Sequence, residues 1–147
     1  MSDYGHELEF GLFPSPDAPR AHHVIELAAV AEDLAPDAVK TGMLASAALV
    51  RQVADAIHGY GWTRLVVDPV MVATSGDRLL DIEAEAVIRE VLLPLAAVVT
   101  PNLDEAAILA GFPVEDEPSM ERAARTILEL GATGVLVKGG HLPGEGL

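Results

Sequence analysis

The feature that most constrains the fold of this chain is its alternation of short aliphatic runs with longer amphipathic segments. Four runs have the length and aliphatic content of strands, and they span residues 37–41, 64–68, 95–100 and 134–138. Apolar residues recur at helical spacing in the segments 22–34, 46–59, 81–93, 102–110 and 118–130, which proline, glycine or capping residues bound. Ser46 is the expected N-cap of the segment 46–59, and Gly111 closes the segment 102–110. Strands that alternate with helices predict an α/β fold with a mostly parallel central sheet.

The composition agrees with this prediction. Half of the residues are hydrophobic but only 4% are aromatic, so the core must be built from Ala, Val, Leu and Ile. Such aliphatic strands are typical of parallel sheets whose two faces are both covered. A chain of 147 residues suits one domain, which we place at residues 22–147. Residues 1–21 carry Pro14, Pro16 and Pro19, and we expect an unassigned N-terminal segment that is mostly loop.

Charge and cysteine content exclude several classes of function. Nine basic residues against 23 acidic ones leave a net charge of −14. Binding to a nucleic acid backbone needs clustered Lys and Arg, so we expect neither nucleic acid nor an anionic membrane surface as a partner. The chain contains no cysteine, so it offers no disulfide or thiol chemistry. It shows no apolar run of membrane-spanning length and no secretory signal pattern, so we expect a cytoplasmic protein.

Polar groups and glycines follow each of the four predicted strands. In open parallel sheets, ligands bind beyond the carboxyl ends of the strands. The sequence therefore predicts a site at one edge of the sheet. The segments that meet there are Gly42-Met43, Asp68-Pro69-Val70-Met71, Thr100-Pro101-Asn102 and Lys138-Gly139-Gly140.

Asp68 is the strongest single candidate, because it ends an aliphatic strand where a carboxylate needs a partner. It can help to place a metal ion or a phosphate ligand, or it can cap the next turn through a backbone N–H. Asn102 and Glu105 lie on one side of a helix start. There Glu105 can hold Mg²⁺ through water, or the pair can form an ordinary capping box.

Two further segments can contact phosphate groups. Residues 73–77 offer hydroxyls and the permissive Gly76, which suits either a loop over phosphate oxygens or a plain turn. Lys138 precedes two glycines, which suits either a cation near phosphates or a solvated lysine. Neither a Gly-x-x-x-x-Gly-Lys-Ser/Thr loop nor a Gly-x-Gly-x-x-Gly fingerprint occurs, so any ATP site here has another architecture.

Taken together, these motifs resemble one family. From about His22 onward, the chain is similar to the hydroxymethylpyrimidine and phosphomethylpyrimidine kinases of thiamine biosynthesis, in the ribokinase-like superfamily. The resemblance rests on five motifs in register: Ala38-Val39-Lys40-Thr41-Gly42-Met43-Leu44, Val67-Asp68-Pro69-Val70-Met71-Val72-Ala73-Thr74-Ser75-Gly76-Asp77, Leu92-Leu93-Pro94, Val99-Thr100-Pro101-Asn102-Leu103-Asp104-Glu105-Ala106 and Val137-Lys138-Gly139-Gly140-His141.

The resemblance implies a three-layer α/β sandwich and ATP-dependent phosphorylation of 4-amino-5-hydroxymethyl-2-methylpyrimidine, of its monophosphate, or of both. It also suggests a homodimer. It implies roles at the shared edge for residues of four of these motifs. Met43 and Val70 would line the pyrimidine pocket, Asp68 and Glu105 would organise Mg²⁺, and Asn102, Gly76 and Lys138 would contact ATP.

The chain departs from the family pattern at its ends. Residues 1–20 do not resemble the glycine-rich start of the family. The family also continues beyond the position of Leu147 to a Gly-x-Gly-x-Thr segment, which supplies the anion hole and the group that activates the hydroxyl. We therefore expect a partial kinase domain, without its own catalytic base, that has little or no activity in isolation.

Three other functions fit some of these residues. A pyridoxal kinase shares the Asp-Pro-Val-Met strand end, although the continuation into Ser75-Gly76-Asp77 favours the thiamine group. A non-catalytic remnant would keep the nucleotide face without turnover. A receiver-type signalling domain would use Asp68, Thr100 and Lys138. The chain lacks the acid pair that such a domain needs after its first strand, and Pro69 fits it poorly, so we set that class aside.

Overall fold

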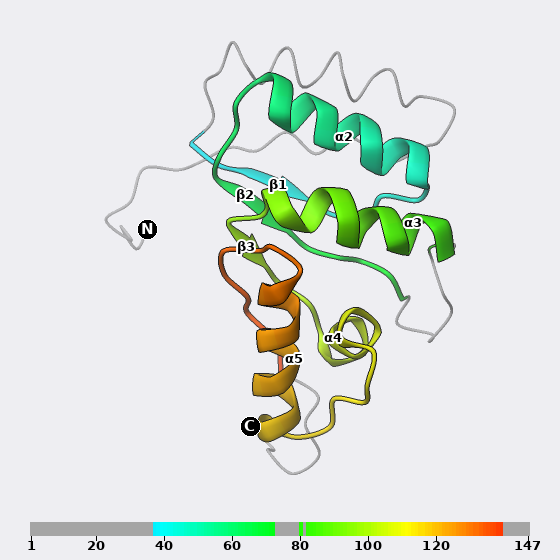
Figure 1. The fold of residues 1–147 in the computed structure, drawn as a ribbon, viewed down its shortest axis with the longest axis vertical. Helices are drawn as coiled ribbons and strands as arrows, with labels where there is room; N and C mark the ends of the chain where they lie inside the picture. The colour runs from blue at the N-terminus through cyan, green and yellow to red at the C-terminus, as the bar shows by residue number, and fades with distance from the viewer. Residues whose placement is uncertain (1–36, 73–79, 81, 140–147) are drawn as a thin grey trace, which may run out of the picture.

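A short parallel sheet forms the centre of the molecule. The computed structural model describes residues 37–72, 80 and 82–139. Its sheet has the order β1-β2-β3, with β1 at Val39–Thr41, β2 at Leu65–Val67 and β3 at Val98–Val99 (Figure 1). Both pairings are parallel, with Lys40 opposite Val66 and Val66 opposite Val98. The predicted α/β class with a parallel sheet is confirmed.

The fourth predicted strand, residues 134–138, also runs parallel to β3. It pairs through two isolated bridges, Val99 with Val135 and Asn102 with Lys138. The backbone N–H groups of Leu136 and Lys138 donate to the carbonyls of Val99 and Pro101, both at 2.8 Å. The segment therefore occupies the next strand position of the sheet, beside β3.

The third predicted strand was too long at its start. Leu95 belongs to a 3-10 turn at Leu93–Leu95, and the N–H of Ala96 closes that turn on the carbonyl of Leu93 at 3.0 Å. Pro94 lies inside this turn, where its missing N–H does no harm because an initial helical position has no partner for it. The strand can start only after the turn has closed, and β3 is therefore short.

Capping residues set the bounds of the helices. Helix α2 spans Ala47–Gly59 after the predicted N-cap Ser46, whose Oγ accepts from the N–H of Leu49 at 3.3 Å. Helix α4 spans Leu103–Ala110 and ends at Gly111, as predicted, and the structure places that glycine in the left-handed conformation. Helix α5 spans Glu117–Glu129, so it begins one residue before the predicted start at Pro118, and its N-cap is Asp116.

The predicted helix 81–93 is continuous but not uniform. Helix α3 spans Ile82–Val87 and continues as a π-helical turn, η2, over Ile88–Leu92. Both α3 and η2 pack against α2, and their buried residues belong to the same core as those of β2 and β3. The largest fully buried side chains include Leu65, Leu92, Leu93, Leu109 and Ile127. None of the helices in the described part of the chain is long and apolar enough to cross a membrane.

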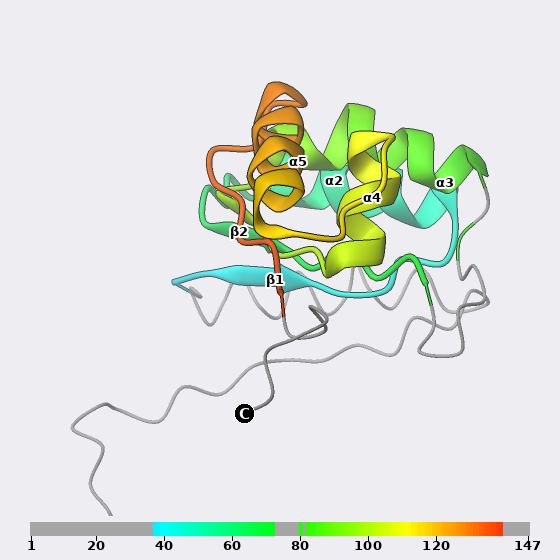
Figure 2. The same ribbon diagram turned by 90° about the horizontal axis from the view of Figure 1, so that it is seen from below.

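The described helices all lie on one side of the sheet. Figure 2 shows α2, α3, α4 and α5 above the plane of β1 and β2. Thr41, Val67 and Val99 share one row of cross-strand partners and are buried on the helix side. Residues one position away along each strand, such as Lys40 and Val66, therefore face the other side. The predicted helix 22–34, like the segment 1–21, lies outside the described residues.

Candidate functional site

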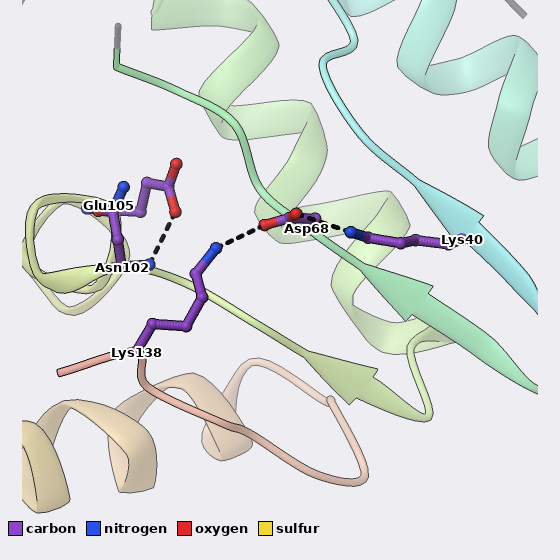
Figure 3. Close-up of polar contacts among 5 residues, drawn as sticks. All are labelled: Lys40, Asp68, Asn102, Glu105 and Lys138. Atoms are coloured by element: carbon purple, nitrogen blue, oxygen red, sulfur yellow. Dashed lines mark hydrogen bonds and ion pairs between the residues drawn. The ribbon is translucent and has the colours of Figure 1, made fainter. Parts of the chain in front are cut away.

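Three charged side chains meet at the carboxyl edge of the sheet, on the side away from the helices. Lys40 is in β1, Asp68 directly follows β2, and Lys138 ends the segment beside β3. Lys40 is paired with Val66, and Asp68 is two residues beyond Val66, so the two side chains point to the same face. Figure 3 shows the carboxylate of Asp68 between the two ammonium groups.

Each carboxylate oxygen of Asp68 contacts one lysine. The Nζ atom of Lys40 lies 2.9 Å from Oδ2, and the Nζ atom of Lys138 lies 3.0 Å from Oδ1. The side chain of Asp68 is 19% exposed, so burial alone would raise its pKa. The hydrogen bonds and charges of Lys40 and Lys138 outweigh that effect and hold the pKa of Asp68 below its ordinary 3.8. Its carboxylate is therefore ionised, and it binds lysines rather than capping the next turn.

Glu105 lies at the start of α4, buried to 3% exposure. Its Oε2 accepts from the backbone N–H of Asn102 at 2.8 Å, and the Oδ1 of Asn102 accepts from the N–H of Glu105 at 2.8 Å (Figure 3). This reciprocal pair is the capping box that the spacing allowed. The other end of α4 is fixed as well, since Arg89 donates to the carbonyls of Leu109, at 3.0 Å, and Ile108.

The electrostatic environment of Glu105 differs from that of Asp68. Burial raises the pKa of Glu105 above its ordinary 4.5, against the lowering effects of the Asn102 backbone, the Lys138 charge and the Met71 backbone. The negative charge of Asp68 also raises this pKa. The two carboxylates are therefore close enough to interact, and at mildly acidic pH Asp68 stays ionised where Glu105 accepts a proton more readily.

This difference predicts the effect of Glu105→Gln on stability. The folded state raises the pKa of Glu105. The protonated carboxyl therefore contributes stability that is fully present below pH 4.5 and is lost as the pH rises through the pKa of the folded state. Glutamine keeps the acceptor that caps α4 and cannot ionise. In urea unfolding at a series of pH values, the variant should match the parent below pH 4.5 and exceed it in stability at neutral pH.

A matched control for this prediction is Glu117→Gln, which removes an exposed acid from the first turn of α5. That change should slightly lower stability at neutral pH, because the acid interacts favourably with the helix dipole. If Glu105→Gln behaved in the same way, the ionised carboxylate of Glu105 would be stabilising, contrary to the prediction.

Of the other predicted site residues, the structure describes Met43 and Val70 but not Gly76. Met43 and Val70 are half-buried and follow β1 and β2 at the same edge. Gly76, in the predicted loop 73–77, lies outside the described residues. Lys40 was not among the predicted site residues, although it stands in a motif of the resemblance. A charged residue within an aliphatic strand was the one sequence signal that pointed to it.

The oxygen donors at this edge fit magnesium in a limited way. Among residues 37–72, 80 and 82–139, no three His, Cys, Asp or Glu side chains come together to hold a metal ion. Asp68 and Glu105 supply carboxylate oxygens, but these oxygens already accept hydrogen bonds from the protein. The donors are the two lysine ammonium groups for Asp68 and the backbone N–H of Asn102 for Glu105. Mg²⁺ keeps several waters and is often bound through one or two carboxylates plus substrate phosphates. The residues therefore fit an ion that arrives on phosphates, not a site made by protein alone.

The fold and this edge define the class of protein. The structure resembles the crystal structure of phosphomethylpyrimidine kinase from Clostridium difficile, with a TM-score of 0.77 and 40% identity over 85% of this chain and 55% of that one. It also resembles the pyridoxal kinase from Staphylococcus aureus in complex with AMP-PCP and pyridoxal, with a TM-score of 0.70 and 34% identity over 80% of this chain and 42% of that one. The chain thus has the α/β fold of the ribokinase-like vitamin kinases.

Sequence comparison identifies the family within that class. The model of the phosphomethylpyrimidine kinase family matches residues 19–146. The hydroxymethylpyrimidine/phosphomethylpyrimidine kinase of Rhizobium meliloti is 51% identical over 121 residues, which are 82% of this chain and 45% of that protein. This chain belongs to the phosphomethylpyrimidine kinase family, and it spans somewhat less than half the length of such relatives.

Proposed function

We propose that this chain carries part of the site of a hydroxymethylpyrimidine/phosphomethylpyrimidine kinase, which transfers a phosphoryl group from ATP to the pyrimidine alcohol or its monophosphate. The observation that carries the proposal is the meeting of Asp68, Lys138 and the start of α4 at one edge of the sheet. These groups lie within the part of the chain that matches the family. The match to a kinase in complex with AMP-PCP supports the use of ATP.

Phosphoryl transfer requires that two ligands be positioned in line and that the developing charge be neutralised. Asp68 and Glu105 are the groups that would hold magnesium through its waters, and Asn102 and Lys138 would contact nucleotide phosphates together with Gly76. When bound, the ion supplies charge neutralisation on the phosphate oxygens. Met43 and Val70 supply apolar surface on the β1 and β2 side of the edge, where the pyrimidine ring would lie.

A pyridoxal kinase is the second candidate. Its support is the structural match to a pyridoxal-bound kinase at 34% identity. Identity to the phosphomethylpyrimidine kinases is higher, at 40% and 51%. We therefore favour the pyrimidine as substrate, and the two alcohols are compared directly in the test below.

The test is a chimaera in which residues 37–139 replace the matching segment of the Rhizobium meliloti enzyme. We expect the chimaera to phosphorylate hydroxymethylpyrimidine with a kcat/KM within about tenfold of the parent enzyme, and to prefer it over pyridoxal. Coupled measurement of ADP release with each alcohol gives both rates. A folded chimaera that is inactive on the pyrimidine contradicts the proposal, and a preference for pyridoxal would favour the second candidate.

A further inference from the structure

The charged edge contains one group that the proposed function does not use, the side chain of Lys40. We infer that Lys40 and Lys138 form a two-ammonium site for a phosphate group, in which Lys40 is a phosphate-binding residue and Asp68 positions both lysines. This inference rests on the proposed function and adds Lys40 to the residues that contact phosphate. It concerns binding that does not need a metal ion.

The first argument is the shared anchor. Asp68 divides its two oxygens between the lysines, at 2.9 Å to Lys40 and 3.0 Å to Lys138. A carboxylate has about four lone-pair sites, so these bonds leave acceptor positions for a magnesium-bound water. The lysines come from β1 and from the segment beside β3, on either side of β2. Asp68 therefore holds two mobile side chains at fixed positions across the middle of the edge.

The second argument concerns the donors that remain. An ammonium group has three N–H donors, and among the described residues the ammonium group of each lysine forms an ion pair only with Asp68. The side chains of Lys40 and Lys138 are 59% and 45% exposed. Most of their donors are therefore directed to solvent at the carboxyl edge of the sheet, where open parallel sheets bind their ligands.

The third argument is the balance of charge. One lysine is enough to neutralise Asp68, so the second is not needed to balance its charge. A second lysine gives the trio a positive charge in a protein whose net charge is −14. Glu105 lies close enough for its pKa to respond to Lys138, but its carboxylate is tied into the start of α4. The exposed side of the trio thus presents ammonium groups, which suits a phosphate oxyanion.

The test uses the 147-residue chain and inorganic tripolyphosphate, titrated by calorimetry without magnesium. We expect Lys40→Met and Lys138→Met each to weaken binding by about tenfold or more. Lys40→Arg should restore most of the affinity, because guanidinium also binds phosphate. The matched control is Arg64→Met, which removes the same charge at the other end of β2, where Arg64 faces Asp37 at 3.9 Å. It should change the affinity by less than about twofold.

Several outcomes would overturn the inference. They are absence of tripolyphosphate binding to the parent chain, equal affinities of Lys40→Met and Arg64→Met, and failure of the arginine variant to restore affinity when circular dichroism shows it folded. Each leaves the kinase proposal intact if the chimaera is active, so the two failures are distinguishable. The titrations are then repeated with ADP and with the pyrimidine monophosphate. The ligand whose affinity falls more in Lys40→Met is the one that presents its phosphate to Lys40.

Discussion

Asp68→Asn, introduced into the chimaera, should lower kcat for pyrimidine phosphorylation by about a hundredfold or more. Asparagine has nearly the same shape but only one carbonyl oxygen and no charge, so it cannot hold both lysines and attracts magnesium weakly. The change removes an electrostatic group at the point where phosphoryl transfer needs positioning. Steady-state kinetics with saturating ATP and pyrimidine measures the loss.

Asp37→Asn is the matched control for this variant. Asp37 is exposed at the amino end of β1, and its carboxylate faces Arg64 rather than the site. Its replacement removes the same charge and should leave kcat within about twofold of the parent chimaera. Equal rates for the two variants would show that the charge of Asp68 has no part in turnover.

The pH dependence of stability gives a second measurement on Asp68. The folded state lowers the pKa of Asp68. Its ion pairs therefore contribute stability that is present above pH 3.8 and is lost as the pH falls through the pKa of the folded state. In the 147-residue chain, Asp68→Asn should therefore be less stable than the parent at neutral pH. The two should converge in acid.

Gly131→Ala should lower the free energy of unfolding by about 2–4 kcal/mol. Gly131 follows α5 with a φ angle of +106°, which side chains disfavour. A Cβ atom there would lie 3.1 Å from Cα and 3.3 Å from Cβ of Pro94, in the turn before β3. The ring of Pro94 is rigid, so the contact is relieved by moving the end of α5 and the turn around Pro94 apart. Urea unfolding followed by circular dichroism measures the change.

Two other glycines separate the causes of this loss. Gly111 also has a positive φ, of +81°, but a Cβ there meets nothing within 4 Å, so Gly111→Ala should cost only about 1–2 kcal/mol. Gly59 ends α2 without a positive φ and with open space around it, so Gly59→Ala should leave stability equal or slightly higher. A loss in Gly131→Ala no larger than that in Gly111→Ala would mean that the contact with Pro94 is easily relieved.

Local features of the fold could be predicted well because their causes lie within a few residues. Ser46 and Asn102 cap their helices through hydrogen bonds to residues three positions away, and Gly111 ends α4 by its conformation. The length of β3 could not be predicted, because Leu95 has the side chain of a strand residue and is held instead in the turn around Pro94. That turn closes by a backbone hydrogen bond which the aliphatic pattern does not reveal.

The positions of the site residues could be predicted from the sequence, but most of their contacts could not. Strand ends and motif spacing pointed to Asp68, Glu105 and Lys138, but not to the pairing of Asp68 with the two lysines. The pairing of Asp68 with Lys40 depends on the register between β1 and β2, which sequence alone does not give. The spacing of Asn102 and Glu105 fitted both a cap and a metal site. The structure shows the cap, while the role in metal binding stays a prediction.

The position of Lys40, Asp68 and Lys138 on one face also bears on how faithfully the sheet assembles. In a strand, a shift of one residue turns every side chain to the opposite face. If β1 or β2 paired one residue out of register, Lys40 or Asp68 would enter the apolar layer beneath α2 and α3, where an unpaired charge is very unfavourable. The same charges that gather at the ligand edge thus discriminate against misaligned strands while the chain folds.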